Sequence, residues 1–249
     1  MILAVVNSKG GVAKSTTAAN TGAALAAMGY KTLLVDLDPQ ASLTYSLGIA
    51  AHELKTTIYD ALKGEPAELV TTKGVNILPA NLELSEAEFQ LSGLPGREFL
   101  LKDAIEPIAE KFDFVFIDCP PSLGLLTINA LVAASGLLIP LQVEYLALMG
   151  IATLTRTQNT VKRRLNKRLE VFGVLPTRYD GRKTLNRDIL EAIKNRFGVK
   201  VFSTVIRENI ALAEAPATGQ TIFEYSPKST GAEDYTNIAK EIIERAAHG

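Results

Sequence analysis

The sequence predicts a doubly wound α/β fold, in which a mostly parallel sheet carries helices on both faces. Short apolar runs alternate with longer amphipathic stretches along all 249 residues, and this is the order of βα units. The runs are apolar throughout, which is typical of parallel strands buried on both faces. No long linker or repeat interrupts the alternation, so we expect one domain over residues 1–249.

Seven short runs, several rich in β-branched or aromatic residues, are predicted to be strands. They are residues 2–7, 32–37, 75–80, 113–118, 136–141, 171–176 and 200–206. Five amphipathic stretches are predicted to be helices, at residues 14–28, 98–110, 146–168, 182–196 and 232–246. Ligands of such sheets bind at the carboxyl ends of strands. Motifs that follow a strand are therefore the candidates for function.

The composition narrows the class of protein. Hydrophobic residues make up 47% and charged residues 21%, which excludes disordered and fibrous chains. No apolar run reaches the roughly 18 residues that span a bilayer, and no basic segment precedes the first apolar run as in a secretory leader. Cys119 is the single cysteine, so one chain cannot form a disulfide or a cysteine-built metal site. We expect a cytoplasmic protein.

Charge is unevenly distributed along the chain. The formal net charge is −1, but residues 156–207 contain 14 Lys and Arg against 4 Asp and Glu. This local excess predicts one face that meets polyanions. No aromatic residues are interleaved with the basic ones, which favours backbone contacts to duplex DNA over stacking on single strands.

A candidate phosphate-binding loop follows the first predicted strand. Its residues are Lys9, Gly10, Gly11, Val12, Ala13, Lys14, Ser15 and Thr16. A strand, a glycine turn and a helix N-terminus together form an anion cradle. Lys14 is predicted to reach the β- and γ-phosphates of a nucleotide, and the Ser15 hydroxyl to ligate Mg²⁺. The Cβ of Ala13 would restrict the loop if a positive φ is needed there.

Carboxylates end two other predicted strands. Asp36 and Asp38 lie at the end of the second strand, and Asp118 ends the fourth. A carboxylate beside a phosphate loop usually holds Mg²⁺ through water. A buried Asp118 needs a partner, and the metal is one. For Asp36, a structural hydrogen-bonding role and outer-shell help to the metal both remain open. Cys119, with no nearby histidine, is predicted to be a small buried hydrophobe.

The chain resembles the ParA/MinD superfamily of ATPases, and most closely the small ParA/Soj proteins. Residues 9–16 resemble their deviant Walker A motif, K-G-G-x-G-K-[ST], with Ala13 in place of the third glycine. DLDPQ resembles switch I, and IDCPPS resembles Walker B with switch II. Further matches occur in order at residues 141–150, 173–190 and 204–235. The resemblance implies a P-loop NTPase fold without the N-terminal helix-turn-helix extension of larger plasmid ParA proteins.

The resemblance also implies roles for individual residues. Lys9 would be the signature lysine that crosses a dimer interface to the partner's nucleotide. Asp38 would position the attacking water. The catalytic residues would be Lys9, Lys14 and Asp38. Ser15, Asp38 and Asp118 would surround the metal. The implied nucleotide contacts are Lys9, Gly10, Gly11, Val12, Ala13, Lys14, Ser15, Thr16, Pro176 and Arg178.

The implied cofactors are ATP and Mg²⁺, and the implied partners are a second copy of the chain, nonspecific double-stranded DNA and a ParB-like activator. Slow hydrolysis would drive chromosome or plasmid partition, or cargo positioning, on the nucleoid. Arg182 matches a DNA-contacting arginine of the family, whereas Ala211 and Glu208 replace two others. Compensating basic residues would include Lys162, Arg163, Arg164, Lys183 and Arg187.

Three other functions remain open. A MinD-like membrane ATPase would need a C-terminal amphipathic membrane segment, whereas we expect the last helix to dock on the core. A nucleotide-dependent synthetase of the same superfamily would leave the basic region unexplained. A nucleotide-gated scaffold would bind ATP without turnover, if Ala13 suppresses hydrolysis.

Overall fold

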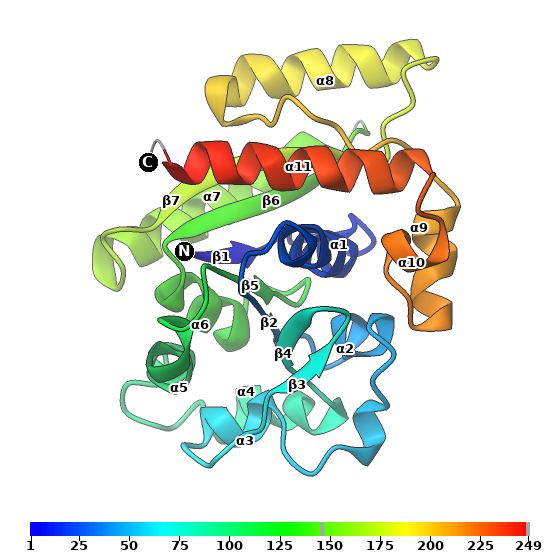
Figure 1. Ribbon diagram of the computed structural model, residues 1–249. Coiled ribbons are helices and arrows are strands. Elements are labelled where there is room, and N and C mark those ends of the chain that lie inside the picture. The colour runs from blue at the N-terminus through cyan, green and yellow to red at the C-terminus, as the bar shows by residue number, and fades with distance from the viewer. Residues whose placement is uncertain (145–146, 248–249) are drawn as a thin grey trace.

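The protein, as a computed structural model, is described over residues 1–144 and 147–247. Seven strands of this part form one sheet in the order β3-β4-β2-β5-β1-β6-β7 (Figure 1). The strands are β1 Ile2–Val5, β2 Thr32–Asp36, β3 Val70–Thr72, β4 Val75–Leu78, β5 Phe114–Asp118, β6 Gly136–Gln142 and β7 Glu170–Thr177. Every neighbouring pair is parallel except β3 and β4.

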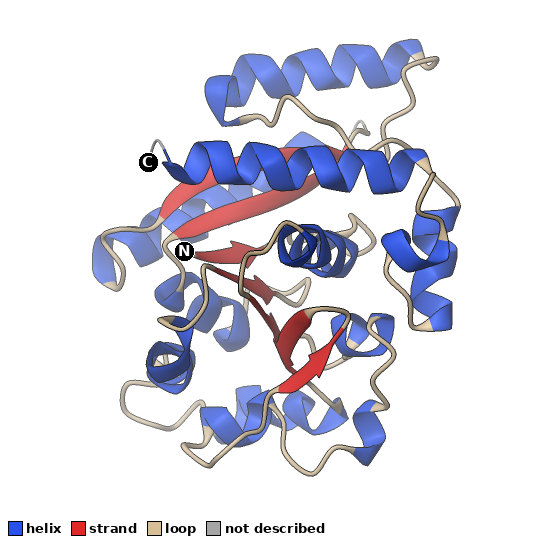
Figure 2. Cartoon of the chain, viewed as in Figure 1, coloured by secondary structure: helices blue, strands red, loops and turns tan. Residues whose placement is uncertain are grey.

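Helices cover both faces of the sheet (Figure 2). The long helices are α1 Lys14–Ala27, α5 Leu100–Ala109, α6 Leu125–Ala133, α7 Ala147–Arg164, α8 Thr184–Phe197 and α11 Thr230–Ala247. The short ones are α2 Ser42–Ser46, α3 Ile58–Leu62, α4 Ala87–Gln90, α9 Ala211–Glu214 and α10 Ile222–Tyr225. Side chains of β1 alternate between two cores, with Leu3 packing among residues of α1 and α11 and Ala4 among residues of α5, α6 and α7. The doubly wound fold is confirmed.

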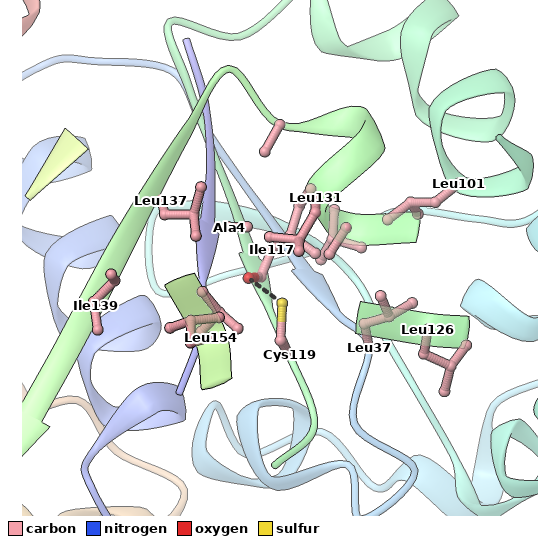
Figure 3. Close-up of a cluster of buried hydrophobic side chains, with 14 of the residues drawn as sticks. Ala4, Leu37, Leu101, Ile117, Cys119, Leu126, Leu131, Leu137, Ile139 and Leu154 are labelled. Carbon is pink, nitrogen blue, oxygen red and sulfur yellow. Dashed lines mark hydrogen bonds between the residues drawn. The ribbon is translucent and has the colours of Figure 1, made fainter. Parts of the chain in front are cut away.

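Cys119 lies in the core beneath α5 and α6 (Figure 3). Its side chain is fully buried, and its Sγ lies 3.7 Å from the carbonyl oxygen of Ile117. Burial raises the pKa of the thiol well above its usual value. The prediction of a small buried hydrophobe is confirmed.

The predicted strand at residues 200–206 is wrong. Only isolated bridges join this segment to the β7 region, at Val174–Val201 and Tyr179–Arg207. Its apolar residues fill the core, because the Phe202 ring packs directly over Gly173. The backbone N–H of Arg207 donates to Asp234 on α11 at 2.9 Å. The apolar pattern there reflects burial without a strand.

The other predicted strands and the five predicted helices are confirmed, with residue 146 outside the described residues. Several elements were not predicted: β3, α6 and the short helices α2, α3, α4, α9 and α10. β3 is a three-residue edge strand with little apolar pattern. α6 is apolar around its whole circumference and shows no helical period.

The chain order places a crevice at the carboxyl edge of the sheet. The connection through α1 runs from β1 to β2 past β5, whereas the connection through α6 runs from β5 to β6 past β1. Such a reversal opens a ligand site beyond the strand ends. None of the helices described in residues 1–144 and 147–247 is long and apolar enough to cross a membrane.

Candidate nucleotide site

A cavity of about 670 Å³ lies at the carboxyl edge of the sheet. Loops from several elements line it: Gly10, Gly11, Ala13, Lys14, Ser15, Thr16, Asp38, Ser42, Ser46, Pro121, Thr177, Arg178, Ile206, Arg207, Glu208, Asn209, Ile210, Leu212, Ala213, Pro216 and Tyr235. Its size falls within the range of small-molecule sites. The structure therefore brings the predicted phosphate loop, Asp38 and Arg178 together around one space.

The phosphate loop has the strain that its sequence predicted. Ala13 is the N-cap of α1 and has φ 71° and ψ 34°, and Gly11 also has a positive φ, 73°. A left-handed conformation is unfavourable by about 1–2 kcal/mol for a residue with a Cβ. The Thr177 hydroxyl donates to the Val12 carbonyl at 3.2 Å, and the Asn7 amide donates to Pro140 at 2.8 Å. These contacts hold the loop in its strained shape.

Backbone strain is concentrated around this cavity. Four non-glycine residues of the described chain have positive φ: Ala13, Ala41, Lys73 and Arg178. Ala13 and Arg178 line the cavity, and Ala41 directly precedes the lining residue Ser42. Strained residues of this kind cluster at functional sites.

Lys14 carries a nearly buried charge into the cavity. Its side chain is 7% exposed, and its ammonium donates to the carbonyl oxygen of Lys9 at 3.3 Å. No carboxylate within salt-bridge distance of Lys14 is found in the described residues. A buried cation without a counter-ion favours an anionic ligand.

Asp36 and Asp118 are buried side by side, but they differ in their hydrogen bonding. They are paired in register on β5 and β2. Asp36 accepts hydrogen bonds from the Thr44 backbone N–H at 2.8 Å and from the Thr44 hydroxyl at 2.7 Å. Burial raises the pKa of Asp36 to about 6, and the bonds from Thr44 oppose this. The hydrogen-bonding role proposed for Asp36 is therefore present.

Neither carboxylate oxygen of Asp118 has a well-aligned hydrogen bond in the described part of the chain. Burial and then the charge of Asp36 raise its pKa well above 3.8, while the Ser15 hydroxyl and Lys14 act in the opposite direction. Buried polar atoms without partners are rare and call for a ligand or an ion. Asp118 fits a metal site on this ground.

Mg²⁺ suits this donor set. Asp38 lines the cavity, and its carboxylate accepts from the Gln40 N–H at 2.9 Å, while its own N–H donates to Asp36 at 3.2 Å. The described residues contain no cluster of three acidic, histidine or cysteine side chains that could hold a metal alone. Mg²⁺ needs no such cage, because it takes one or two carboxylates together with waters and phosphate oxygens. Ser15, Asp38 and Asp118 can supply the protein's share.

Comparison with known proteins gives the family. A family model described as an AAA domain matches residues 1–171. The sporulation initiation inhibitor protein Soj of Bacillus subtilis is 43% identical over 253 residues, which cover 100% of this chain and 99% of that protein. The chromosome partitioning protein ParA of Caulobacter vibrioides is 41% identical over 98% of this chain and 94% of its own. The chain belongs to the ParA/MinD-type family of partition ATPases.

Solved structures of the same fold include two with nucleotide. One, of cobyrinic acid a,c-diamide synthase from Mycobacterium smegmatis with bound ADP and magnesium, has a TM-score of 0.88 and 40% identity, covering 99% of this chain and 95% of that one. The septum site-determining protein MinD from Pyrococcus horikoshii, complexed with Mg-ADP, has a TM-score of 0.79 and 28% identity, covering 97% and 95%.

The far wall of the cavity comes from the segment after β7 and from α11. The Arg207 guanidinium donates to Asp234 on α11 at 2.6 Å, and the Tyr235 hydroxyl lies 3.3 Å from the Thr17 hydroxyl on α1. These contacts tie the wall to both α11 and α1. Pro176, a predicted nucleotide contact, lies within β7 and does not line the cavity.

Sequence reasoning missed several lining residues: Ser42, Ser46, Pro121, Asn209, Ile210, Leu212, Ala213, Pro216 and Tyr235. Pro121 lies in the IDCPPS segment, and the six residues from Asn209 to Tyr235 lie in the matched segment 204–235, but no role was assigned to any of them. Ser42 and Ser46, on α2, lie outside the DLDPQ segment.

Lys9 lies outside the cavity lining. Its ammonium forms an ion pair with the Glu144 carboxylate, and its side chain is 44% exposed. Thus the lysine predicted to serve a partner is engaged within its own subunit.

The predicted DNA-binding residues form two groups at opposite ends of β7. Arg182, Lys183 and Arg187 follow its carboxyl end, where Asp180 binds both Arg182 and Lys183. The second group, Lys162, Arg163 and Arg164, ends α7 and lies near Glu170 at the start of β7, with which Lys162 pairs. An eight-residue strand is about 26 Å long. These six predicted residues therefore lie in two patches, and Lys200, which follows α8, also pairs with Glu170.

Proposed function

We propose that residues 1–249 act as one ATPase domain that uses ATP and Mg²⁺ to switch between a free subunit and a closed, DNA-binding homodimer. Hydrolysis reopens the dimer and drives chromosome or plasmid partition, or the positioning of another cargo. A ParB-like protein accelerates the slow hydrolysis, and the protein works on the nucleoid. Relatives named chromosome partitioning protein ParA, 41–42% identical over 98% of this chain, support this function.

One observation carries the catalytic part of the proposal. Lys14, which lines the cavity, is a nearly buried cation with no carboxylate within salt-bridge distance among the described residues, and the neighbouring Asp118 is a buried carboxylate without an aligned donor. Each is unfavourable alone. Triphosphate beside Lys14 and a hydrated metal beside Asp118 would satisfy both, which explains why the fold tolerates them.

Each residue then has a distinct task. The N–H groups of the phosphate loop and Lys14 bind the phosphates, and Ser15 and Asp118 hold the metal's ligand sphere. Mg²⁺, when bound, offsets phosphate charge. Asp38 orients the water for in-line attack on the γ-phosphate. Lys9 neutralises charge on the partner's nucleotide. Because the γ-phosphate contacts only the closed state fully, hydrolysis shifts the population back to free subunits.

DNA binding is assigned to the basic patch at Arg182, Lys183 and Arg187. It borders the cavity wall, because Lys183 pairs with the lining residue Glu208 at 3.1 Å. A change in the cavity is therefore transmitted to this patch by a direct ion pair. The patch beyond Lys162 adds nonspecific phosphate contacts.

Membrane attachment through the last helix finds no support in the packing. Tyr235, Ile238 and Ile242 of α11 are fully buried against α1 and the sheet. The apolar face of α11 is thus packed in the core and is not free to contact a membrane.

A synthetase is the second candidate, because the M. smegmatis structure is named as a diamide synthase. Amide formation needs ammonia, which glutaminases release with a reactive cysteine. Cys119, the single cysteine, is fully buried with a raised pKa. A synthetase built on this chain would therefore have to take free ammonia or a separate glutaminase.

Two variants test the proposed function. Asp38→Ala should trap the ATP-bound dimer on random-sequence duplex DNA, because it binds nucleotide but cannot orient water. Loss of nucleotide binding in this variant would remove Asp38 from its assigned role.

Lys9→Ala should bind ATP but form no ATP-dependent dimer by analytical ultracentrifugation. Dimers that persist would refute the role of Lys9 across the interface.

A further inference from the structure

We infer that Glu144 is a positioning residue that holds Lys9 inside its own subunit, so that a closed dimer forms only after this ion pair breaks. The inference deepens the proposed function and depends on it, since Lys9 is there assigned to the partner's phosphates.

The pair joins two anchored segments. The Lys9 backbone N–H donates to the Asn7 side chain at 3.0 Å, and Asn7 in turn donates to the Pro140 carbonyl on β6. Glu144 follows β6 and its N–H donates to the carbonyl of Gln142 at 2.9 Å. Both ends of the ion pair are therefore fixed to the same strand. This lowers the entropy that a solvent-accessible pair must lose to form.

Two further hydrogen bonds hold the backbone next to Glu144 in place. Val143 donates its backbone N–H to the Thr177 carbonyl at 3.1 Å, and its own carbonyl accepts from the Asn186 side chain of α8 at 2.9 Å. The Glu144 side chain is 32% exposed and is hydrogen-bonded to the Lys9 ammonium. Lys9 therefore meets a carboxylate whose backbone is already in place.

Nucleotide binding would remove a second contact of Lys9, the hydrogen bond that its backbone carbonyl accepts from Lys14. In this structure the Lys14 ammonium donates to the Lys9 carbonyl at 3.3 Å. A phosphate oxygen is a stronger acceptor than a neutral carbonyl, because its bond is charge-assisted. Lys14 would turn to the phosphates when ATP binds and leave the Lys9 carbonyl. The Lys9 backbone would then keep its bond to Asn7, and its ammonium would keep the contact with Glu144.

The effect of the Lys9–Glu144 ion pair on the dimerisation equilibrium can be derived from its solvent exposure. In the proposed closed dimer each Lys9 ammonium leaves Glu144 for a partner's phosphate, so a symmetric dimer breaks two such pairs. An exposed ion pair changes an equilibrium by about 1.4- to 5-fold, so two change it by about 2- to 30-fold. The Glu144–Lys9 ion pair, called the latch below, is thus a weak restraint. It opposes dimerisation without nucleotide, and the contacts of a triphosphate can outweigh its free energy.

The test compares Glu144→Gln with wild type and with Glu65→Gln. Glu65 is a matched control, because it is an exposed acid paired with Lys63 and lies far from the cavity lining. We expect the dimer dissociation constant in saturating ATP to fall about 2- to 30-fold in Glu144→Gln and to stay unchanged in Glu65→Gln. An unchanged constant would overturn the latch. A weaker dimer would show that Glu144 contacts the partner instead.

A second measurement is independent of dimers. Acetic anhydride labelling of the nucleotide-free protein, with Lys9 acetylation compared to that of exposed Lys55 by mass spectrometry, reports whether Lys9 is engaged. Labelling of Lys9 should rise several-fold in Glu144→Gln and not in Glu65→Gln. Equal labelling in all three proteins would refute the contact itself. If labelling rises while wild type forms no ATP dimer, the proposed function fails and the contact stands.

Discussion

The amino edge of the sheet, where its parallel strands begin, and the carboxyl edge, where they end, differ in how well their polar groups are paired. At the amino edge, the Asn166 amide donates to three carbonyls at the end of α6, those of Leu131, Val132 and Ala134, at 2.7–3.1 Å. Glu170 there is paired with Lys162 and Lys200. At the carboxyl edge, Asp118 lacks an aligned donor, and Lys14 lacks a counter-ion among the described residues.

This difference identifies the working end of the molecule. Satisfied polar groups stabilise a fold, whereas unsatisfied charges and strained backbone persist only where the rest of the structure holds them in place. The amino edge is built for stability. The carboxyl edge is built to be completed by a ligand.

The largest expected effect comes from Asp118→Asn at the carboxyl edge. Turnover with Mg-ATP should fall roughly 10- to 100-fold, as expected for loss of a group that orients a metal's ligands. The nucleotide-free variant should nevertheless be more stable than wild type at pH 7, because an unsatisfied buried carboxyl is gone. Steady-state phosphate release and urea unfolding measure the two quantities.

The pH dependence of that stability gain has a defined sign. The pKa of Asp118 is raised above 3.8 in the folded protein, so the folded state holds this proton to a higher pH than the unfolded chain does. Wild-type stability is therefore lost as pH rises from about 4 through the raised pKa. The advantage of Asp118→Asn should grow over the same range. A constant difference across pH would contradict the burial argument.

The second comparison concerns the two basic patches. Arg182→Glu should remove the ATP-dependent part of DNA binding, because its patch contacts the cavity wall through Lys183 and Glu208. Arg163→Glu with Arg164→Glu should weaken DNA binding by the ATP-bound protein but leave its dependence on ATP in place. Each lost phosphate contact should lower the slope of log affinity against log salt by about 0.9. Identical behaviour of the two sets would remove the distinction between the patches.

The smallest effect is expected at Ala13. Ala13→Gly relieves a left-handed alanine, which gains about 1–2 kcal/mol, but it adds freedom to the unfolded chain, which loses about 0.4–1 kcal/mol. A net stabilisation of about 0–1.6 kcal/mol should appear in urea unfolding. Destabilisation would mean that the methyl group makes a contact that outweighs its strain.

The sequence predicted the fold well where pattern and burial agree. Strands such as Thr32–Asp36 are buried at every position and have an apolar centre at residues 33–35, so their pattern was unambiguous. Residues 200–206 failed because Phe202 is buried without a strand ladder. Local pattern reports burial, and only the tertiary arrangement decides which backbone groups pair.

The phosphate end of the site was predictable because its residues are contiguous. Lys14 and Ser15 line the cavity as expected. The rest of the lining was less predictable, since Tyr235 and Pro216 lie far along the chain from the phosphate loop. Spacing could not anticipate the pairing of Lys9 with Glu144 or the separation of Arg182 from Arg163, because both depend on the length and position of β6 and β7.

The most direct test of the account is retention of the wild-type protein on random-sequence duplex DNA, without nucleotide, with ADP and with ATP, each across a salt series. The account predicts binding with ATP and Mg²⁺ alone, falling steeply as salt rises. Equal binding in all three states, or no binding while ATP is bound, would contradict a nucleotide-switched DNA-binding ATPase.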